Sequence, residues 1–283
     1  MTTPLRARQP DKTAGTISKG AVGSRRPFRD ITNASRSSTS ATEITPKMRA
    51  ILVDWLIEVH HSFRLKEETL FLAVNYLDRF LNAEPVARKE LQLVGIGALF
   101  IAAKLEEIDP IEAADLVFVC DEAFRADEIV SMERRILQAL RFDLIVPTTH
   151  AILDIFLQEA GVTRSVQLVA QLLAQHSLYH LNFSAAYTPS VLAAASLFAA
   201  TCAVDGARPS SHWMQSFERL TSHSMMDVID CSRDLCVVMA SPSRRLAGLR
   251  RKFASKRFDR IVHPEQNAEL LATLQTRLAD LIQ

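Results

Sequence analysis

Apolar residues recur at helical spacing along most of the chain beyond residue 44. The pattern opens at Thr45-Pro46, where a threonine able to cap a helix precedes a proline suited to the first helical position. The stretch MRAILVDWLIEVHHSF follows and predicts the first helix. Further helices are predicted at about residues 67–82, 88–107, 110–119, 125–140, 148–159, 164–180, 189–203, 210–219 and 224–239. Strand-like alternation does not run for a useful length, so the pattern indicates an all-α protein.

The predicted helices fall into two consecutive groups of five, which suggests that one helical fold occurs twice. The first group covers residues 45–144. The second group opens near Pro147 and covers residues 145–242. Each group has the length of an ordinary small domain, so we expect two consecutive five-helix folds.

Both ends of the chain differ from this pattern. Residues 1–44 are rich in Ser, Thr, Arg and Ala and contain too few large apolar residues to bury a core, which predicts a disordered arm. Residues 243–283 begin with a basic stretch over 244–257, which we expect to be a solvated linker. A last amphipathic helix is predicted over about 265–282.

The first helix carries apolar residues on nearly every face, which is typical of a helix buried in the middle of a fold. Asp54 lies within it, and an unpaired buried carboxylate would cost several kcal/mol. A cation must therefore lie close to Asp54, and the start of the third helix offers Arg88 and Lys89. We expect a structural ion pair at this position rather than a catalytic group.

The third helix, ARKELQLVGIGALFIAAKLEE, contains many small residues that let neighbouring helices approach closely. We therefore expect it to be the central helix of the first group. Lys104 follows the buried stretch and should emerge at the rim of the fold, while Glu133 lies in the fifth helix. From their spacing alone, we would interpret these two residues as surface charges on a helical protein that binds partners.

Bulk composition excludes several functional classes. A net charge of +1 argues against an electrostatic interaction with nucleic acid or an anionic membrane. The longest apolar run, over residues 93–103, is too short to span a bilayer. The four cysteines form no C-x-x-C pair and have no histidine at zinc-ligand spacing, which predicts reduced thiols and no metal. We find no phosphate loop and no nucleophile elbow, so neither an enzyme nor a cofactor is predicted.

Several segments resemble a known family. MRAILVDWLIEV, ETLFLAVNYLDRFL, LQLVGIGALFIAAKLEEI and MERRIL together resemble the cyclin box of A- and B-type cyclins. PTTHAILDIFL and YTPSVLAAASLFAA resemble the second cyclin fold, and RRKFASKRFDRIVHPEQNAELLATL resembles the C-terminus of B-type members. The resemblance implies a non-catalytic subunit that binds and activates a cyclin-dependent Ser/Thr protein kinase and controls the G2/M transition.

The resemblance also implies a kinase-binding surface. In the family, a Lys and a Glu at the rim of the first fold hold the C-helix of the kinase, and apolar residues around them pack on that helix. Docking moves the C-helix inward, which allows the active-site Lys–Glu ion pair of the kinase to form. The matching residues here are Ile101, Lys104, Leu105, Glu133, Leu137 and Phe142.

A second surface implied by the resemblance binds Arg-x-Leu peptides of substrates and inhibitors. The Leu enters an apolar cleft made by residues on one face of the first helix, and polar residues near it receive the Arg. The matching residues here are Met48, Ile51, Leu52, Trp55, Glu58, Gln92 and Asp121. The buried Asp–Arg pair of the family matches Asp54 and Arg88, in agreement with the need for a cation at Asp54.

The N-terminal arm contains RRPFRDITN, which resembles the destruction box of mitotic cyclins. The residues in register are Arg25, Phe28, Ile31 and Asn33, with Phe28 standing where the family usually has Leu. This likeness implies a ubiquitin ligase of the anaphase-promoting type as a partner. It also implies residence in the nucleus and the cytoplasm.

Two other functions remain open from the residues alone. A scaffold with cyclin folds would bind a kinase without activating it, and the sequence shows no sign of the extra amphipathic helix that A- and B-type cyclins carry before the cyclin box. A basal transcription factor of the IIB type also contains a double cyclin fold and binds DNA. That function would call for a zinc ribbon and a strongly basic surface, and the sequence has neither.

Overall fold

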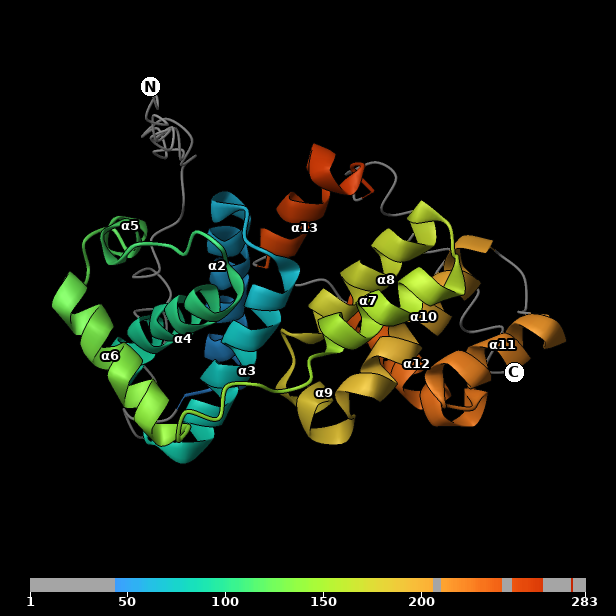
Figure 1. Ribbon diagram of the computed structural model, residues 1–283, viewed down its shortest axis with the longest axis horizontal. Helices are drawn as coiled ribbons and strands as arrows, with labels where there is room; N and C mark the ends of the chain where they lie inside the picture. The colour runs from blue at the N-terminus through green and yellow to red at the C-terminus, as the bar shows by residue number, and fades with distance from the viewer. Residues whose placement is uncertain (1–43, 206–209, 241–245, 262–275, 277–283) are drawn as a thin grey trace, which may run out of the picture.

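A computed structural model describes residues 44–205, 210–240 and 246–261, together with residue 276. Its regular elements are helices, which form two groups side by side (Figure 1). The first group contains α2 (Pro46–Phe63), α3 (Glu67–Ala83), α4 (Leu91–Glu106), α5 (Ala113–Val119) and α6 (Ala126–Ala139), with the 3-10 turn η1 (Arg88–Glu90) before α4. The second group contains α7 (Thr149–Ala160), α8 (Arg164–Ser177), α9 (Leu181–Ala186), α10 (Pro189–Asp205), α11 (Ser211–Thr221) and α12 (Met225–Ala240). The chain continues into α13 (Gly248–Phe253) and the 3-10 turn η2 (Lys256–Phe258).

The predicted fold class of two consecutive all-α folds is confirmed. Thr45 caps α2 as expected, with its side-chain oxygen accepting a hydrogen bond from the Met48 amide at 3.3 Å. The second fold has one helix more than the five predicted, because the short helix α9 lies between the predicted helices at 164–180 and 189–203, which correspond to α8 and α10. The predicted last helix at 265–282 lies outside the described residues except for Thr276, and the predicted arm over 1–44 lies outside them except for Ile44.

Each fold is built around one helix that is buried along most of its length. In the first fold this helix is α4, which is buried from Leu91 to Ala103. A Cβ atom on Gly95 would lie 2.8 Å from a Leu52 methyl group of α2, so glycine is needed for this close approach. In the second fold α10 has the same position, and its run of small residues around Ala194 is fully buried. Small side chains therefore let both central helices be surrounded on all sides.

Arg49 of α2 connects the two folds. Its guanidinium makes a two-pronged ion pair with Asp78 of α3, at 2.5 and 2.7 Å. It also donates a hydrogen bond of 2.8 Å to the carbonyl oxygen of Leu178, just after α8 in the second fold. The arginine and the carboxylate are both largely withdrawn from solvent, so each depends on the other for its charge to be compensated.

Asp54 is not paired with Arg88, and this prediction was wrong. The Asp54 carboxylate accepts hydrogen bonds from the Tyr179 hydroxyl at 2.6 Å and from the Gly248 and Ala247 amides at 2.8 and 3.1 Å. Burial raises the pKa of Asp54, and these three donors offset part of the rise. The expected partner was an arginine of the same fold, whereas the real partners lie in the second fold and at the start of α13.

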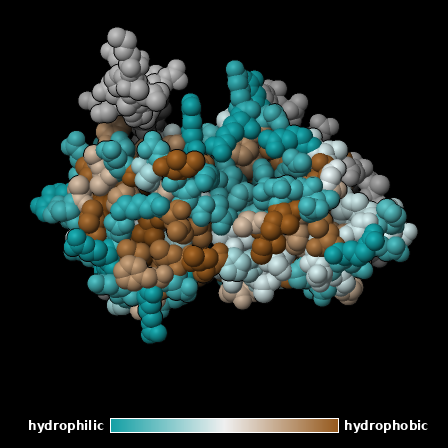
Figure 2. All heavy atoms as spheres, in the orientation of Figure 1, coloured by the Kyte–Doolittle hydropathy of each residue, from teal (hydrophilic) through white to brown (hydrophobic). Residues whose placement is uncertain are grey.

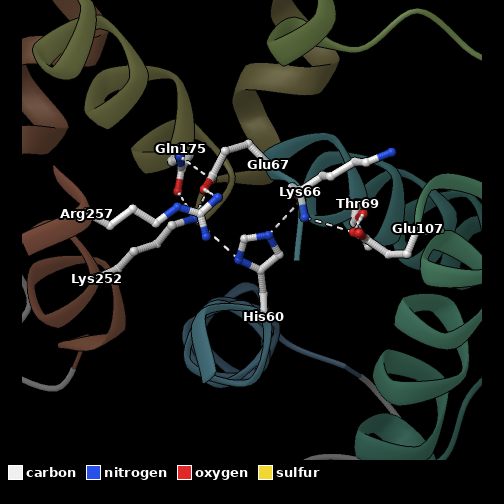
Figure 3. A network of polar contacts seen from close by, with 8 residues as sticks. All are labelled: His60, Lys66, Glu67, Thr69, Glu107, Gln175, Lys252 and Arg257. Atoms are coloured by element: carbon white, nitrogen blue, oxygen red, sulfur yellow. Dashed lines mark hydrogen bonds and ion pairs between the residues drawn. The ribbon is translucent and has the colours of Figure 1, made fainter. Parts of the chain in front are cut away.

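The described part of the basic stretch, residues 246–257, is not a solvated linker, because it contains α13 and Lys252 of that helix is completely buried. Its ammonium group lies between side chains of three other helices (Figure 3). It donates to Glu67 of α3 at 2.5 Å and to Gln175 of α8 at 2.7 Å, and it lies 3.4 Å from the Nδ1 atom of His60 of α2. One cation therefore joins both folds to the C-terminal segment.

The charges of this cluster (Lys252, Glu67, Gln175 and His60) follow from their surroundings. Burial lowers the pKa of Lys252 to about 8, although the Glu67 carboxylate opposes that effect. Burial also lowers the pKa of His60 to about 3, and the ammonium of Lys252 acts in the same direction. The Nε2 atom of His60 lies 2.8 Å from the Lys66 carbonyl oxygen, so Nε2 donates and Nδ1 is left as the acceptor facing Lys252. A neutral histidine is therefore part of the folded structure.

Replacement of Lys252 by Met should destabilise the protein strongly. We expect the free energy of unfolding to fall by roughly 3–5 kcal/mol, because the Glu67 carboxylate would stay buried without its main cation. Urea denaturation of the full chain measures this, with the exposed Lys256→Met in η2 as a control that should change it by less than about 0.5 kcal/mol. The double variant Lys252→Met with Glu67→Gln should recover part of the loss. Equal losses of stability in Lys252→Met and Lys256→Met would contradict the role of Lys252 as the buried cation of this cluster.

The free energy of unfolding should also decrease as the pH is lowered, because of His60. Its pKa is about 3 in the folded chain and near 6.5 when unfolded, so below pH 6.5 only the unfolded chain binds this proton. The stability that neutral His60 contributes is complete above pH 6.5 and is lost by about 1.4 kcal/mol per pH unit as the pH falls toward 3. Denaturation between pH 7.5 and 5 should show about one proton less taken up on unfolding in His60→Gln than in the wild type. Identical pH slopes would contradict this account.

Candidate functional site

Lys104 and Glu133 lie side by side at the rim of the first fold. Lys104 comes in the last turn of α4, and its ammonium donates to both carboxylate oxygens of Glu133 on α6, at 2.7 and 2.9 Å. The ammonium also lies over the ring of Phe100, 3.8 Å from its centroid. The structure thus brings together two residues that the sequence places 29 positions apart, and it holds them on helices rather than loops.

The apolar residues expected at the same surface differ in exposure. Ile101 is buried and Leu137 is half-buried, so both form the base of the surface. Leu105 is exposed, and Phe142 leaves 67% of its side chain in solvent. Phe142 and the preceding Arg141 both have positive φ angles, in a tight turn in which the Phe142 amide donates to the Leu137 carbonyl oxygen at 2.9 Å. The turn fixes an aromatic residue at the end of α6, beyond Leu137.

The expected peptide-docking residues of α2 are unequally exposed. Met48 and Ile51 are half-buried, while Leu52 and Trp55 are buried. Leu52 packs against Gly95 of α4, which makes it part of the core beneath the surface. Any apolar ligand on this face would therefore contact Met48 and Ile51 first.

The three polar residues expected at the same site come from three elements. Glu58 lies one turn after Asp54 on α2 and forms an ion pair with Arg251 of α13. Gln92 is nearly buried in the first turn of α4, the helix that packs on α2. Asp121 is exposed after α5, in a turn with a positive φ angle. α5 packs on α6, so α2 is not its main neighbour (Figure 1).

The remaining sequence predictions concern other kinds of site. The destruction-box residues around Arg25 and Asn33 lie outside the described residues. Within the described ranges, no group of three or more His, Cys, Asp or Glu side chains is arranged to hold a metal ion. In the same ranges, no helix is both long and apolar enough to cross a membrane.

Comparison with protein families resolves the ancestry of both folds. The family model described as the cyclin N-terminal domain matches residues 28–145, and the one described as the cyclin C-terminal domain matches residues 147–266. The chain belongs to the cyclin family. The two matched regions meet between α6 and α7, so each of the two helix groups corresponds to one cyclin fold.

Curated relatives of this cyclin are B-type members. Cyclin-B2-2 of Oryza sativa subsp. indica is 37% identical over 77% of this chain and 52% of its own length. Cyclin-B2-2 of Arabidopsis thaliana is 37% identical over 82% of this chain and 53% of its own length. G2/mitotic-specific cyclin-2 of Medicago sativa is 37% identical over 76% of this chain and 65% of its own length. The chain spans about half the length of the first two of these relatives.

A solved structure gives the same fold. The viral cyclin from herpesvirus saimiri superposes with a TM-score of 0.60, at 23% sequence identity, over 69% of this chain and 85% of that chain. At this level of identity the likeness concerns the arrangement of helices and not the ligands.

Further exposed apolar residues of the first fold were missed by sequence reasoning. Ile108 leaves 98% of its side chain in solvent and Ile145 leaves 89%, and Phe118 is also exposed. These residues come after α4, after α6 and within α5, in the same fold as Lys104. Figure 2 shows apolar side chains gathered over this fold, with a smaller apolar area over the second. Their signal in the sequence is weak, because two of them lie outside the helices and have no periodic neighbours.

Proposed function

We propose that this cyclin binds and activates a cyclin-dependent Ser/Thr protein kinase through the rim of its first fold. The observation that carries the proposal is the Lys104–Glu133 pair on α4 and α6, with exposed Leu105 next to Lys104 in the chain and exposed Phe142 in the turn after α6. The apolar residues supply contact area, and the two opposite charges fix the orientation of a bound helix. The chain provides no catalytic group in this proposal, since phosphate transfer belongs to the kinase.

The rim pair suits a surface that exchanges partners. Lys104 is about half exposed, so its pairing with Glu133 contributes little to stability in water. Both charges can therefore turn toward a kinase helix at little cost. In the family, such docking moves the C-helix of the kinase inward and completes its active-site Lys–Glu pair. The rigid helices α4 and α6 would hold the C-helix in that position.

The face of α2 is proposed to dock Arg-x-Leu peptides. Met48 and Ile51 are the accessible apolar residues, with Leu52 and Trp55 beneath them. Glu58 supplies a carboxylate for the Arg of the peptide. The similarity to B-type and G2/mitotic-specific cyclins supports a role at the G2/M transition. We further propose residence in the nucleus and the cytoplasm, and ubiquitin-dependent removal through the segment that resembles a destruction box.

The double charge reversal Lys104→Glu with Glu133→Lys tests the kinase surface. The exchanged side chains can still pair with each other, so the fold should be kept while the kinase meets opposite charges. Stimulation of a monomeric mitotic-type kinase toward a histone-type substrate should fall by at least about tenfold. A matched control reverses the exposed pair on α12, with Asp230→Arg and Arg233→Asp, and should leave stimulation unchanged.

Two results would contradict this proposal. Equal stimulation by wild type and rim reversal would place the kinase elsewhere on the cyclin. Binding of the wild type without stimulation would favour a scaffold that holds a kinase without activating it.

Replacement of Arg25 and Phe28 by Ala should prolong the life of the protein in a mitotic extract. Both residues belong to the segment that resembles a destruction box, and they would be read by the ubiquitin ligase as an extended peptide. We expect the half-life to lengthen several-fold, with Arg6→Ala and Pro10→Ala as a control within the same arm. Equal half-lives of wild type and variant would exclude this segment as the degradation signal.

A further inference from the structure

The C-terminal segment already contacts the carboxylate that a docking peptide would use. Arg251 of α13 donates through Nη1 to Oε1 of Glu58 on α2. The Glu58 side chain is 19% exposed, whereas the Arg251 side chain is 64% exposed. The carboxylate is therefore held in place by the first fold, while the guanidinium reaches it from the solvent side.

The position of Arg251 depends on how α13 is fixed against α2. The amides of Ala247 and Gly248 donate to the Asp54 carboxylate, and the Leu249 amide lies 3.3 Å from the Tyr179 hydroxyl oxygen. A Cβ atom at Gly248 would lie only 2.6 Å from the Asp54 carbonyl oxygen, so the two backbones touch. Arg251 comes about one helical turn after this contact, as Glu58 does after Asp54. The geometry of the two helices thus places the guanidinium beside the carboxylate.

We propose that Arg251 competes with the arginine of Arg-x-Leu peptides for Glu58, so that the C-terminal segment of this cyclin limits its own substrate docking. This inference rests on the proposed docking function of α2. Both ligands present the same chemistry, a guanidinium, to one carboxylate whose side chain is only 19% exposed. A peptide arginine has to displace Arg251 before it can pair with Glu58.

The competition is weak enough to permit regulated docking. Arg251 is mostly in solvent, so it can turn away without moving the rest of α13, which Lys252 and Phe253 hold by burial. Exposed ion pairs stabilise by less than about 1 kcal/mol, which corresponds to a factor of up to about five in affinity. Arg251 therefore lowers the affinity for docking peptides without preventing their binding.

The test measures peptide binding to the full chain by fluorescence anisotropy. The probe is a labelled peptide that contains Arg-x-Leu, and its partner peptide has Ala in both positions. Arg251→Gln is compared with Arg250→Gln, which removes the same charge from the same helix at an exposed residue. Arg251→Gln should bind the probe about two- to fivefold more tightly than Arg250→Gln. In a Glu58→Gln background this difference should disappear, because the shared carboxylate charge is gone.

The outcomes distinguish failure of the competition from failure of the docking function. In one outcome, all proteins prefer the Arg-x-Leu probe and the two arginine variants bind it with equal affinity. That result would overturn the competition and leave the docking surface intact. Absence of any preference between the two peptides, in the wild type and in Arg251→Gln, would overturn the docking function itself. A difference between the arginine variants that persists in the Glu58→Gln background would also overturn the competition, since the effect would not pass through Glu58.

Discussion

The buried ammonium of Lys252 is the contact on which the arrangement of the two folds depends. It pairs with Glu67 of the first fold and Gln175 of the second, and it faces the unprotonated Nδ1 atom of His60. A charge withdrawn from water is tolerated only when it is paired and hydrogen-bonded. Displacement of Glu67 would leave the buried ammonium without its counter-charge, and displacement of Gln175 or His60 would remove a neutral polar partner. The packing of α13, the junction of the folds and the exposed face of α2 are therefore coupled through one side chain.

Further polar contacts of α2 reinforce the same junction. Arg49 binds Asp78 in its own fold and a carbonyl oxygen of the other, while Asp54 accepts from Tyr179 and from the start of α13. All of them involve α2, which explains why this helix is polar at isolated positions within an apolar sequence. The α2 helix thus has two roles: its apolar residues fill the core of the first fold, and its buried polar residues orient the second fold and the C-terminus.

Periodicity predicted the helices because the relevant information is local. The pattern of α2 and the small residues of α4 were sufficient to place both in the centre of the first fold, and family resemblance was needed to select Lys104 and Glu133 as functional residues. The partners of Asp54 could not be found locally, since the Gly248 amide comes from 194 residues away. The basic residues around α13 suggested a solvated linker. The spacing of Leu249, Lys252 and Phe253 on one helical face was the available sign that this segment packs inward.

The two proposed surfaces consequently differ in what can change them. The kinase surface lies on α4 and α6, within one fold, and the contacts that shape it are made by residues near in sequence or by direct packing of those two helices. The docking face of α2 is bordered by α13, whose position is set by contacts with both folds. Under the proposed competition, substitutions in the C-terminal segment would therefore alter peptide docking and leave the proposed kinase surface as it is. Under the two proposals, changes in the C-terminal segment would act on substrate docking through the Arg251–Glu58 contact and not through the Lys104–Glu133 pair.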